Sequence, residues 1–216
     1  MSINLKKAYW EFRDLGYRKY LFKLRNYLFF KKYSYSKPYF LNSDLRNNLH
    51  KFKSKKSINS FLEIGSFEGL ASAWINKKYL KNNGSHIIVD PLTDINDETT
   101  DVDMIVEENF YFNLNKMKKN NLLFERKTSD NFFNKNTIQF DFIYIDGSHT
   151  LEDIKNDLEN SHKFIMKNGI IWCDDYLGGD HPNYCKIPMD NFYEKYKDKY
   201  EIIFRGYQIA FKRNSN

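Results

Sequence analysis

The sequence has 216 residues, which is long enough for one domain with a substantial buried core. Its two cysteines, Cys173 and Cys185, do not form a CxxC pair, and residues 1–60 lack the apolar core of a signal peptide. We therefore expect a reduced, cytoplasmic setting. Charged residues interrupt every aromatic cluster, so no stretch approaches the ~18 unbroken apolar residues of a transmembrane helix.

Charge is unevenly distributed along the chain. Residues 1–60 contain 15 lysines and arginines against three acidic residues, so this part carries +12, although the whole chain carries only +6. Aromatic and leucine side chains recur at roughly helical spacing through residues 10–28, which predicts one or two amphipathic helices. We expect residues 1–57 to form a basic, helical N-terminal extension and residues 58–216 to form the main domain. The extension could bind an anionic partner, present a solvated helix face, or provide the contact of a homo-oligomer.

From residue 58 onward, short apolar runs alternate with helical stretches. Runs of about five apolar residues separated by longer helices predict parallel strands joined by right-handed crossovers. The predicted strands cover residues 58–65, 86–90, 121–127, 140–146 and 169–175, and the predicted helices cover residues 70–80, 103–119, 151–166 and 186–200. Residues 200–213 predict two further strands in an antiparallel hairpin around Gly206. The fold class is therefore α/β: a Rossmann-like, mostly parallel seven-stranded sheet with an antiparallel C-terminal hairpin and helices on both faces.

Ligands of such sheets bind beyond the carboxyl ends of the strands, and acidic residues occur at four of the five strand ends. In the turn EIGSFEG after the first strand, Gly65 and Gly69 allow close backbone approach, and the following helix offers unpaired amides to a ligand. Asp90, at the end of the second strand, suits the two hydroxyls of a ribose. The spacing GxxxG, in place of GxGxxG, argues against a dinucleotide but not against a nucleoside with an amino-acid tail.

Four stretches together, FLEIGSFEGLASAWI, HIIVDP, FDFIYIDGSHTLEDIKNDL and NGIIWCDDY, resemble the class I S-adenosylmethionine-dependent methyltransferases. The resemblance covers about residues 58–212 and extends to catechol O-methyltransferase and to metal-dependent sugar and macrolide O-methyltransferases. It implies S-adenosylmethionine as cofactor. The implied cofactor-binding residues are Glu63, Gly65 and Ser66 on the methionine side, Gly69 at the helix, Asp90 at the ribose, Ser129 beside adenine, and Asp146.

The resemblance also implies a divalent metal held by Asp146, Asp174 and Asp175, with His149 as the general base and Asp146 as its catalytic partner. Three carboxylates crowded at neighbouring strand ends resist ionisation unless a cation, most simply Mg²⁺, holds them. A histidine is suited to accept a proton near neutral pH. Alternatively, Asp146 could cap the helix that follows it, Asp174 and Asp175 could be solvated loop residues, and His149 could be structural.

The expected function is that of an S-adenosylmethionine-dependent O-methyltransferase, assisted by a divalent metal and acting on a hydroxyl of a sugar, glycan or other small molecule. The preference for a sugar rests on the resemblance, supported by an aromatic content of 18% that could stack on sugar faces. A nucleic acid is the less favoured substrate, because the chain has no NPPY-like or DPPY-like stretch. The alternative is a non-catalytic module with a methyltransferase fold that binds nucleic acid or a membrane surface through the basic extension.

Overall fold

The computed structural model describes residues 28–92, 100–117, 121–178 and 184–215. The chain forms two compact units, residues 1–34 and residues 35–216. Most of the predicted N-terminal helical stretch lies in residues 1–27, outside the described residues. In the first unit, the ring of Phe29 contacts the rings of Phe30 and Tyr33 at centroid distances of 4.9 and 5.1 Å.

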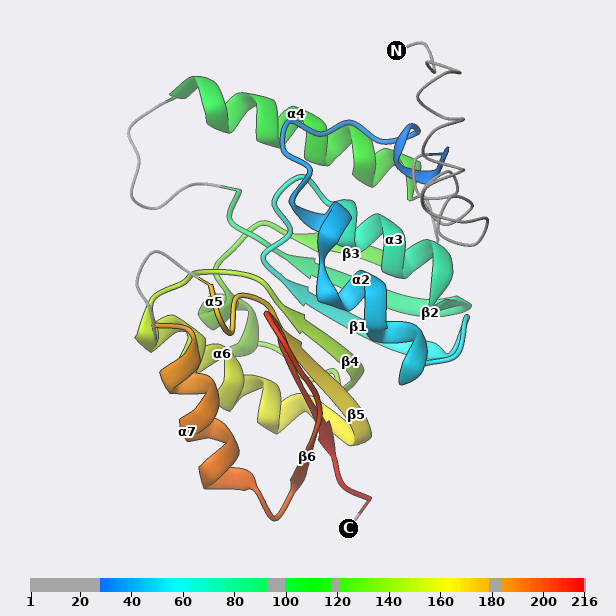
Figure 1. The fold of residues 1–216 in the computed structure, drawn as a ribbon. Coiled ribbons are helices and arrows are strands. Elements are labelled where there is room, and N and C mark those ends of the chain that lie inside the picture. Colours follow the sequence, from blue (N-terminus) through cyan, green and yellow to red (C-terminus); the bar gives the residue numbers. More distant parts are fainter. Residues whose placement is uncertain (1–27, 93–99, 118–120, 179–183, 216) are drawn as a thin grey trace, which may run out of the picture. The chain divides into compact units, whose positions relative to one another are not determined.

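The second unit contains the sheet and its helices (Figure 1). In chain order, its elements are η1 (Tyr39–Asn42), α2 (Asp44–Asn48), η2 (Leu49–Lys51), β1 (Ile58–Ile64), α3 (Leu70–Lys78), β2 (Leu80–Val89), α4 (Thr100–Lys116), β3 (Leu122–Glu125), α5 (Ser129–Phe133), β4 (Phe140–Ile145), α6 (Leu151–Phe164), β5 (Ile165–Cys173), α7 (Lys186–Tyr196), β6 (Tyr200–Arg205) and β7 (Ile209–Arg213). Helix α2 and the two short 3-10 helices precede the first strand and belong to this unit; Leu45 and Leu49 in them are fully buried.

The seven strands form one sheet in the order β3-β2-β1-β4-β5-β7-β6. The first five pair in parallel, whereas β7 pairs antiparallel with both β5 and β6. This arrangement confirms the predicted Rossmann-like sheet with its C-terminal hairpin. The strand order reverses between β1 and β4, which is where open α/β sheets bind their ligands.

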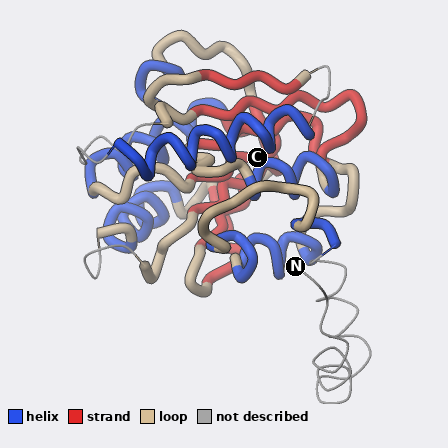
Figure 2. Tube along the Cα trace, turned by 90° about the horizontal axis from the view of Figure 1, so that it is seen from above, coloured by secondary structure: helices blue, strands red, loops and turns tan. Residues whose placement is uncertain are grey.

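Helices cover both faces of the sheet. Helices α2, α3 and α4 lie on one side and α5, α6 and α7 on the other (Figure 1), and the view from above shows the strands grouped with helices around them (Figure 2). Because side chains alternate along a strand, each strand contributes to both layers. No helix in the described part of the chain has the length and apolar character needed to cross a membrane.

The two layers are chemically different. The layer beneath α5, α6 and α7 is an aliphatic and aromatic core that includes Leu62, Ile143 and Ile171. On the opposite face, Glu63 pairs in register with Tyr144, and Tyr144 pairs with Trp172. Polar groups are therefore buried on this opposite face, close to the carboxyl ends of the strands.

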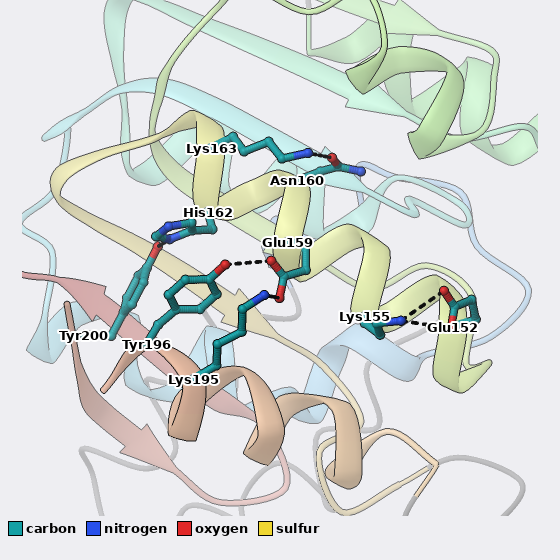
Figure 3. A network of polar contacts seen from close by, with 9 residues as sticks. All are labelled: Glu152, Lys155, Glu159, Asn160, His162, Lys163, Lys195, Tyr196 and Tyr200. Carbon is teal, nitrogen blue, oxygen red and sulfur yellow. Dashed lines mark hydrogen bonds and ion pairs between the residues drawn. The ribbon is translucent and has the colours of Figure 1, made fainter. Parts of the chain in front are cut away.

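A polar network joins α6, α7 and β6 on the side of the sheet covered by α5, α6 and α7 (Figure 3). The carboxylate of Glu159 accepts hydrogen bonds from Lys195 and from Tyr196, both at 2.7 Å. His162 Nδ1 lies 2.9 Å from the hydroxyl of Tyr200, and its ring stacks on Tyr196 at 4.0 Å. His162 thus has a packing role between elements.

Several elements differ from the sequence-based expectation, and three of these differences have a structural reason. β2 begins at Leu80, six residues before the expected start at residue 86, because Leu80 pairs with Ile58 on β1. β5 begins at Ile165, where pairing with Phe140 ends the helix that the sequence pattern extends to residue 166. The short helix α5 was not expected; Thr128 caps it by accepting a hydrogen bond from the amide of Asn131.

Candidate active site

The candidate site lies at the carboxyl ends of β1, β2, β4 and β5, at the point where the strand order reverses. The turn after β1 approaches the turn after β4 very closely. Gly65 has φ of +76°, its amide donates to the carbonyl of Val89 at 2.9 Å, and a Cβ on it would overlap the backbone carbonyl of Asp146. Only glycine combines this conformation with this approach.

Gly69 also has φ of +76° and is the N-cap of α3. A Cβ there would lie 3.4 Å from the ring of Phe110, which is close packing without overlap of backbone atoms. The helix therefore begins directly at the turn after β1, where its first amides face the strand ends.

Asp90 holds this turn in shape. Its Oδ2 accepts hydrogen bonds from the amide of Ser66 (2.6 Å), the hydroxyl of Ser66 (2.8 Å) and the amide of Phe67 (3.1 Å). Its Oδ1 accepts from the amide of Leu92 at 2.7 Å. The structure therefore brings Asp90 and Ser66 together, and the carboxylate is already engaged by three backbone amides and by the hydroxyl of Ser66.

Glu63 is fully buried behind the turn. Ser72 donates to its Oε2, and His86 Nε2 lies 3.7 Å from the same oxygen. Burial raises the pKa of Glu63 to about 8, although the hydrogen bond from Ser72 opposes this effect. Among the described residues, Glu63 Oε1 has no hydrogen-bond partner.

Ser129 is the first residue of α5, and its hydroxyl lies near the buried carboxyl of Asp157 on α6, whose pKa it lowers against the effect of burial. Burial raises the pKa of Asp157 to about 7. The residue expected beside adenine therefore lies at the start of α5 near Asp157, whose Oδ2 is 3.8 Å from the position that a Cβ on Gly147 would take.

The turns after β4 and β5 bring three side chains together. One ligand atom from each of Asp146, His149 and Asp175 lies within 4.8 Å of the other two. His149 Nε2 lies 2.9 Å from Asp175 Oδ2, with the imidazole about half exposed and the carboxylate largely buried. Asp175 has φ of +51°, an uncommon conformation for a residue other than glycine and one that concentrates at functional sites.

The structure excludes two alternatives to a functional role: that Asp146 caps the helix after it, and that Asp175 is a solvated loop residue. Thr150 is the N-cap of α6, because its hydroxyl accepts from the amide of Asp153 at 3.2 Å, so Asp146 does not cap that helix. Asp175 is not a freely solvated loop residue, since Tyr207 donates to its Oδ1 at 2.7 Å. The same carboxylate therefore joins the imidazole of His149 to the hydroxyl of Tyr207.

Asp174 lies on the other side of Asp146. Its Oδ1 accepts from the amide of Asp175 at 2.8 Å, and its Oδ2 accepts from the hydroxyl of Tyr144. The hydroxyl of Tyr144 also lies 3.0 Å from Asp146 Oδ2. All three predicted carboxylates thus converge, but Asp174 turns toward Tyr144 and His149 completes the cluster with Asp146 and Asp175.

Burial raises the pKa values of Asp146 and Asp174, whereas hydrogen bonds lower the pKa of Asp175. Burial raises the pKa of Asp146 well above its ordinary value, and the charges of Asp174 and Asp175 raise it further. Burial also raises the pKa of Asp174, against the hydrogen bond from Tyr144. Burial alone would raise the pKa of Asp175, but the hydrogen bonds from His149 and Tyr207 outweigh it and lower that pKa. Asp175 therefore retains its charge most readily.

The three carboxylates and the imidazole line one pocket, and Ile154, Cys185 and Met189 form its apolar wall. Three residues in or behind the site were not anticipated from the sequence: Tyr144, Tyr207 and Gln208. Tyr144 reads as one more buried residue of an apolar strand, although its position two residues before Asp146 places both on the same face. Tyr207 and Gln208 belong to the C-terminal hairpin, and only the fold brings them to the strand ends.

Comparison with known proteins agrees with this architecture. Residues 62–176, more than half of the chain, match a family model described as a methyltransferase domain. No curated protein matches the chain in sequence. Among solved structures, the chain resembles a protein from Clostridium thermocellum described as a presumed rRNA methylase, with 13% identity and a TM-score of 0.61 over 79% of this chain and 94% of that one.

Two further solved structures are similar over almost the whole chain. One is an O-methyltransferase from Bacillus cereus in complex with SAH, with 13% identity, a TM-score of 0.56 and 97% coverage of both chains. The other is the O-methyltransferase TomG from Streptomyces achromogenes in complex with SAM, with 15% identity and a TM-score of 0.53 over 100% of this chain and 91% of that one. At these identities the likeness concerns the fold. Together with the family match, it shows that the chain belongs to the methyltransferase domain family and has the fold of the class I S-adenosylmethionine-dependent methyltransferases.

Proposed function

We propose that this protein is an O-methyltransferase that uses S-adenosylmethionine, is assisted by a divalent cation, and methylates a hydroxyl of a sugar, a glycan or another small molecule. The convergence of Asp146, His149 and Asp175 carries this proposal. A proton-accepting imidazole and two carboxylates meet beside the glycine turn where the family binds its cofactor.

The turn after β1 fits the cofactor. Gly65 has no side chain, so the backbone of Asp146 packs directly against it, and Asp90 fixes the backbone of Ser66 and Phe67 beside this contact. In this proposal Gly65, Ser66 and Gly69 face the methionine part. Asp90 reaches the ribose through Oδ1, which accepts only the amide of Leu92 and keeps its second lone pair, whereas Oδ2 is fully engaged by Ser66 and Phe67.

The donor set also fits a cation. Two carboxylates with an imidazole beside them are ligands for a hard divalent ion such as Mg²⁺ or for Mn²⁺. The raised pKa of Asp146 reflects burial and like charges that a cation would offset. In this proposal Asp146 and Asp175 hold the ion, and Asp174, whose two oxygens accept from Asp175 and Tyr144, lies beside them as a support.

The chemistry then divides among the chain's own residues. A bound cation would lower the pKa of a coordinated acceptor hydroxyl and fix its oxygen. Asp175 holds the imidazole of His149 through Nε2. The imidazole accepts the proton while the acceptor oxygen forms its bond to the methyl carbon and the sulfur keeps the electron pair of the broken bond. Ile154, Cys185 and Met189 keep water from one wall of the pocket.

Tyr207 supports the preference for a small acceptor that carries hydroxyl groups. Half of its side-chain surface is exposed, while its hydroxyl is held by Asp175. The ring therefore stands beside the candidate site at a fixed position, where it can pack on the apolar face of a sugar or on an aromatic ring.

The test is calorimetric titration with S-adenosylmethionine in the presence and absence of Mg²⁺, followed by methyl-transfer assays on catechols, nucleosides and saccharides. We expect cofactor binding, and transfer to a hydroxyl acceptor that stops when the cation is removed by excess chelator. Full transfer in chelator would reject the role of the cation, and transfer to nitrogen acceptors alone would reject O-methylation.

A further inference from the structure

A buried tyrosine lies between two of the carboxylates at the candidate site. Tyr144 is fully buried on β4, and its hydroxyl contacts Asp146 Oδ2 at 3.0 Å as well as Asp174 Oδ2. A phenol has one proton, so the two carboxylates share a single donor. The Tyr144 hydroxyl, which comes from within the sheet, therefore joins the turn after β4 to the turn after β5.

Gln208 orients this tyrosine. Its Oε1 accepts from the amide of Leu45 at 2.5 Å and from the indole nitrogen of Trp172 at 2.8 Å, and both of these groups can only donate. The side-chain amide therefore has one orientation, with Nε2 directed at Ser43 Oγ (3.0 Å) and at the hydroxyl of Tyr144 (3.5 Å). Because the phenol oxygen faces a donor, its proton is directed toward the carboxylates.

We propose that Tyr144, oriented by Gln208, is a positioning residue for the cation-binding carboxylates of this enzyme. This inference rests on the proposed cation-assisted function. The hydroxyl fixes the rotation of the Asp146 carboxylate through one oxygen and leaves its other acceptor positions for the cation. It also holds the carboxylate of Asp174 to one side, so that this group does not enter the space between Asp146 and Asp175.

A purely structural role for Tyr144 makes a different prediction. Tyr144→Phe keeps the ring and its packing and removes only the hydroxyl, so a structural role would change thermal stability and leave cation affinity unaltered. A positioning role changes cation affinity, because partners that orient metal ligands usually contribute about 10–100-fold to metal binding. Cofactor affinity should be unchanged under either role, since the substitution removes only the hydroxyl, whose partners in the described structure are Asp146, Asp174 and Gln208 and not the glycines of the turn after β1.

A matched control is available in the same sheet. Tyr200 is also buried, on β6, and its hydroxyl lies 2.9 Å from His162 Nδ1 in the network shown in Figure 3. Tyr200→Phe removes the hydroxyl of another buried tyrosine, away from the strand-end carboxylates. Gln208→Met provides a second route to the same question, because it keeps the length of the side chain and removes the amide that orients Tyr144.

The experiment is calorimetric titration of the full chain with Mn²⁺, and separately with S-adenosylmethionine, for the wild type and each variant. We expect Tyr144→Phe to weaken Mn²⁺ binding at least roughly tenfold, Tyr200→Phe to leave it within about twofold, and all variants to bind the cofactor like the wild type. If Gln208 acts through Tyr144, then Gln208→Met should weaken Mn²⁺ binding in the wild type but add little to Tyr144→Phe.

The outcomes separate the two proposals. Wild-type Mn²⁺ affinity in Tyr144→Phe would overturn the positioning role while the proposed function stands. Absence of Mn²⁺ binding to the wild type would overturn the cation-assisted function and the positioning role with it. Should Tyr144→Phe fail to fold by circular dichroism, Gln208→Met decides the question: unchanged Mn²⁺ affinity in that variant would overturn the proposal.

Discussion

Gly65 and Asp146 lie in direct backbone contact: a Cβ on Gly65 would overlap the carbonyl of Asp146. The glycine turn after β1 and the acidic turn after β4 therefore form one surface, although they are far apart in the sequence. Gly69 shares the φ of Gly65 but has no backbone atom in its way, which makes the two glycines a matched pair.

We predict that Gly65→Ala destabilises the protein more than Gly69→Ala. Both variants meet the conformational penalty of a positive φ, about 1 kcal/mol or more, and only Gly65→Ala must also separate two backbone segments. Urea unfolding gives the two free energies of unfolding, and calorimetry gives cofactor affinity. Equal destabilisation by the two substitutions would show that the close approach is unimportant.

Asp146→Ala should abolish methyl transfer and cation binding while cofactor affinity changes by less than roughly tenfold, about 1.4 kcal/mol. The reason is that Asp146 is placed in the cation site, whereas the glycine turn and Asp90 remain. Asp141→Ala is the control on the same strand, because Asp141 accepts hydrogen bonds from Asn59 at the opposite end of β4. Loss of cation binding in Asp141→Ala as well would assign the effect to the strand rather than to the site.

His149→Ala should reduce the chemical step by about 10²–10⁴-fold, the usual contribution of a general base. The acidic limb of the pH–rate profile should disappear with it, since no imidazole remains to be deprotonated. The measurement is single-turnover kinetics between pH 5 and pH 9, with His50→Ala, an exposed histidine on η2, as the control. Cation affinity should persist in His149→Ala; its loss would instead make His149 a metal ligand.

Asp157→Asn should stabilise the protein at alkaline pH. Burial raises the pKa of Asp157 from its ordinary 3.8 to about 7. The folded state therefore holds a proton that the unfolded state has lost, and stability falls as pH rises from about 4 to about 7. The variant lacks this decline, so it should match the wild type near pH 4 and exceed it at pH 8 by about 1–4 kcal/mol.

Urea unfolding of both proteins across this pH range tests the prediction for Asp157. Asp198→Asn removes a carboxyl from an exposed position whose charge is not among the causes of the Asp157 shift, and it supplies the control. A constant difference between Asp157→Asn and the wild type from pH 4 to pH 8 would contradict the assignment, since it would mean that the carboxyl does not titrate differently on folding.

The sheet could be predicted because its strands are short apolar runs with acidic or glycine ends, a local signal that survives without tertiary information. Positions such as Asp146 and Asp175 followed from the rule that parallel strands end at one edge. The start of β2 at Leu80 was beyond this reasoning, because it depends on the pairing of Leu80 with Ile58, and an irregular polar stretch separates this pair from the next one at Ser85.

The hydrogen bonds of the site could not be anticipated in the same way. That Asp90 uses its carboxylate on the backbone of Ser66 and Phe67 depends on the conformation of the turn after β1. The contact of Gln208 with Tyr144 depends on packing between the hairpin and α2, and a local sequence pattern cannot predict such packing. Sequence patterns placed residues at an edge of the sheet, and the fold determined which of them touch.

The contact between Gln208 and Leu45 joins residues that are 163 positions apart. During synthesis on the ribosome, the segment around Leu45 is made long before its partner in the hairpin. The acidic turns after β4 and β5 thus emerge before the group that orients Tyr144 beneath them. Assembly of the site is in this sense a late event in folding, and it waits for the C-terminal hairpin to dock.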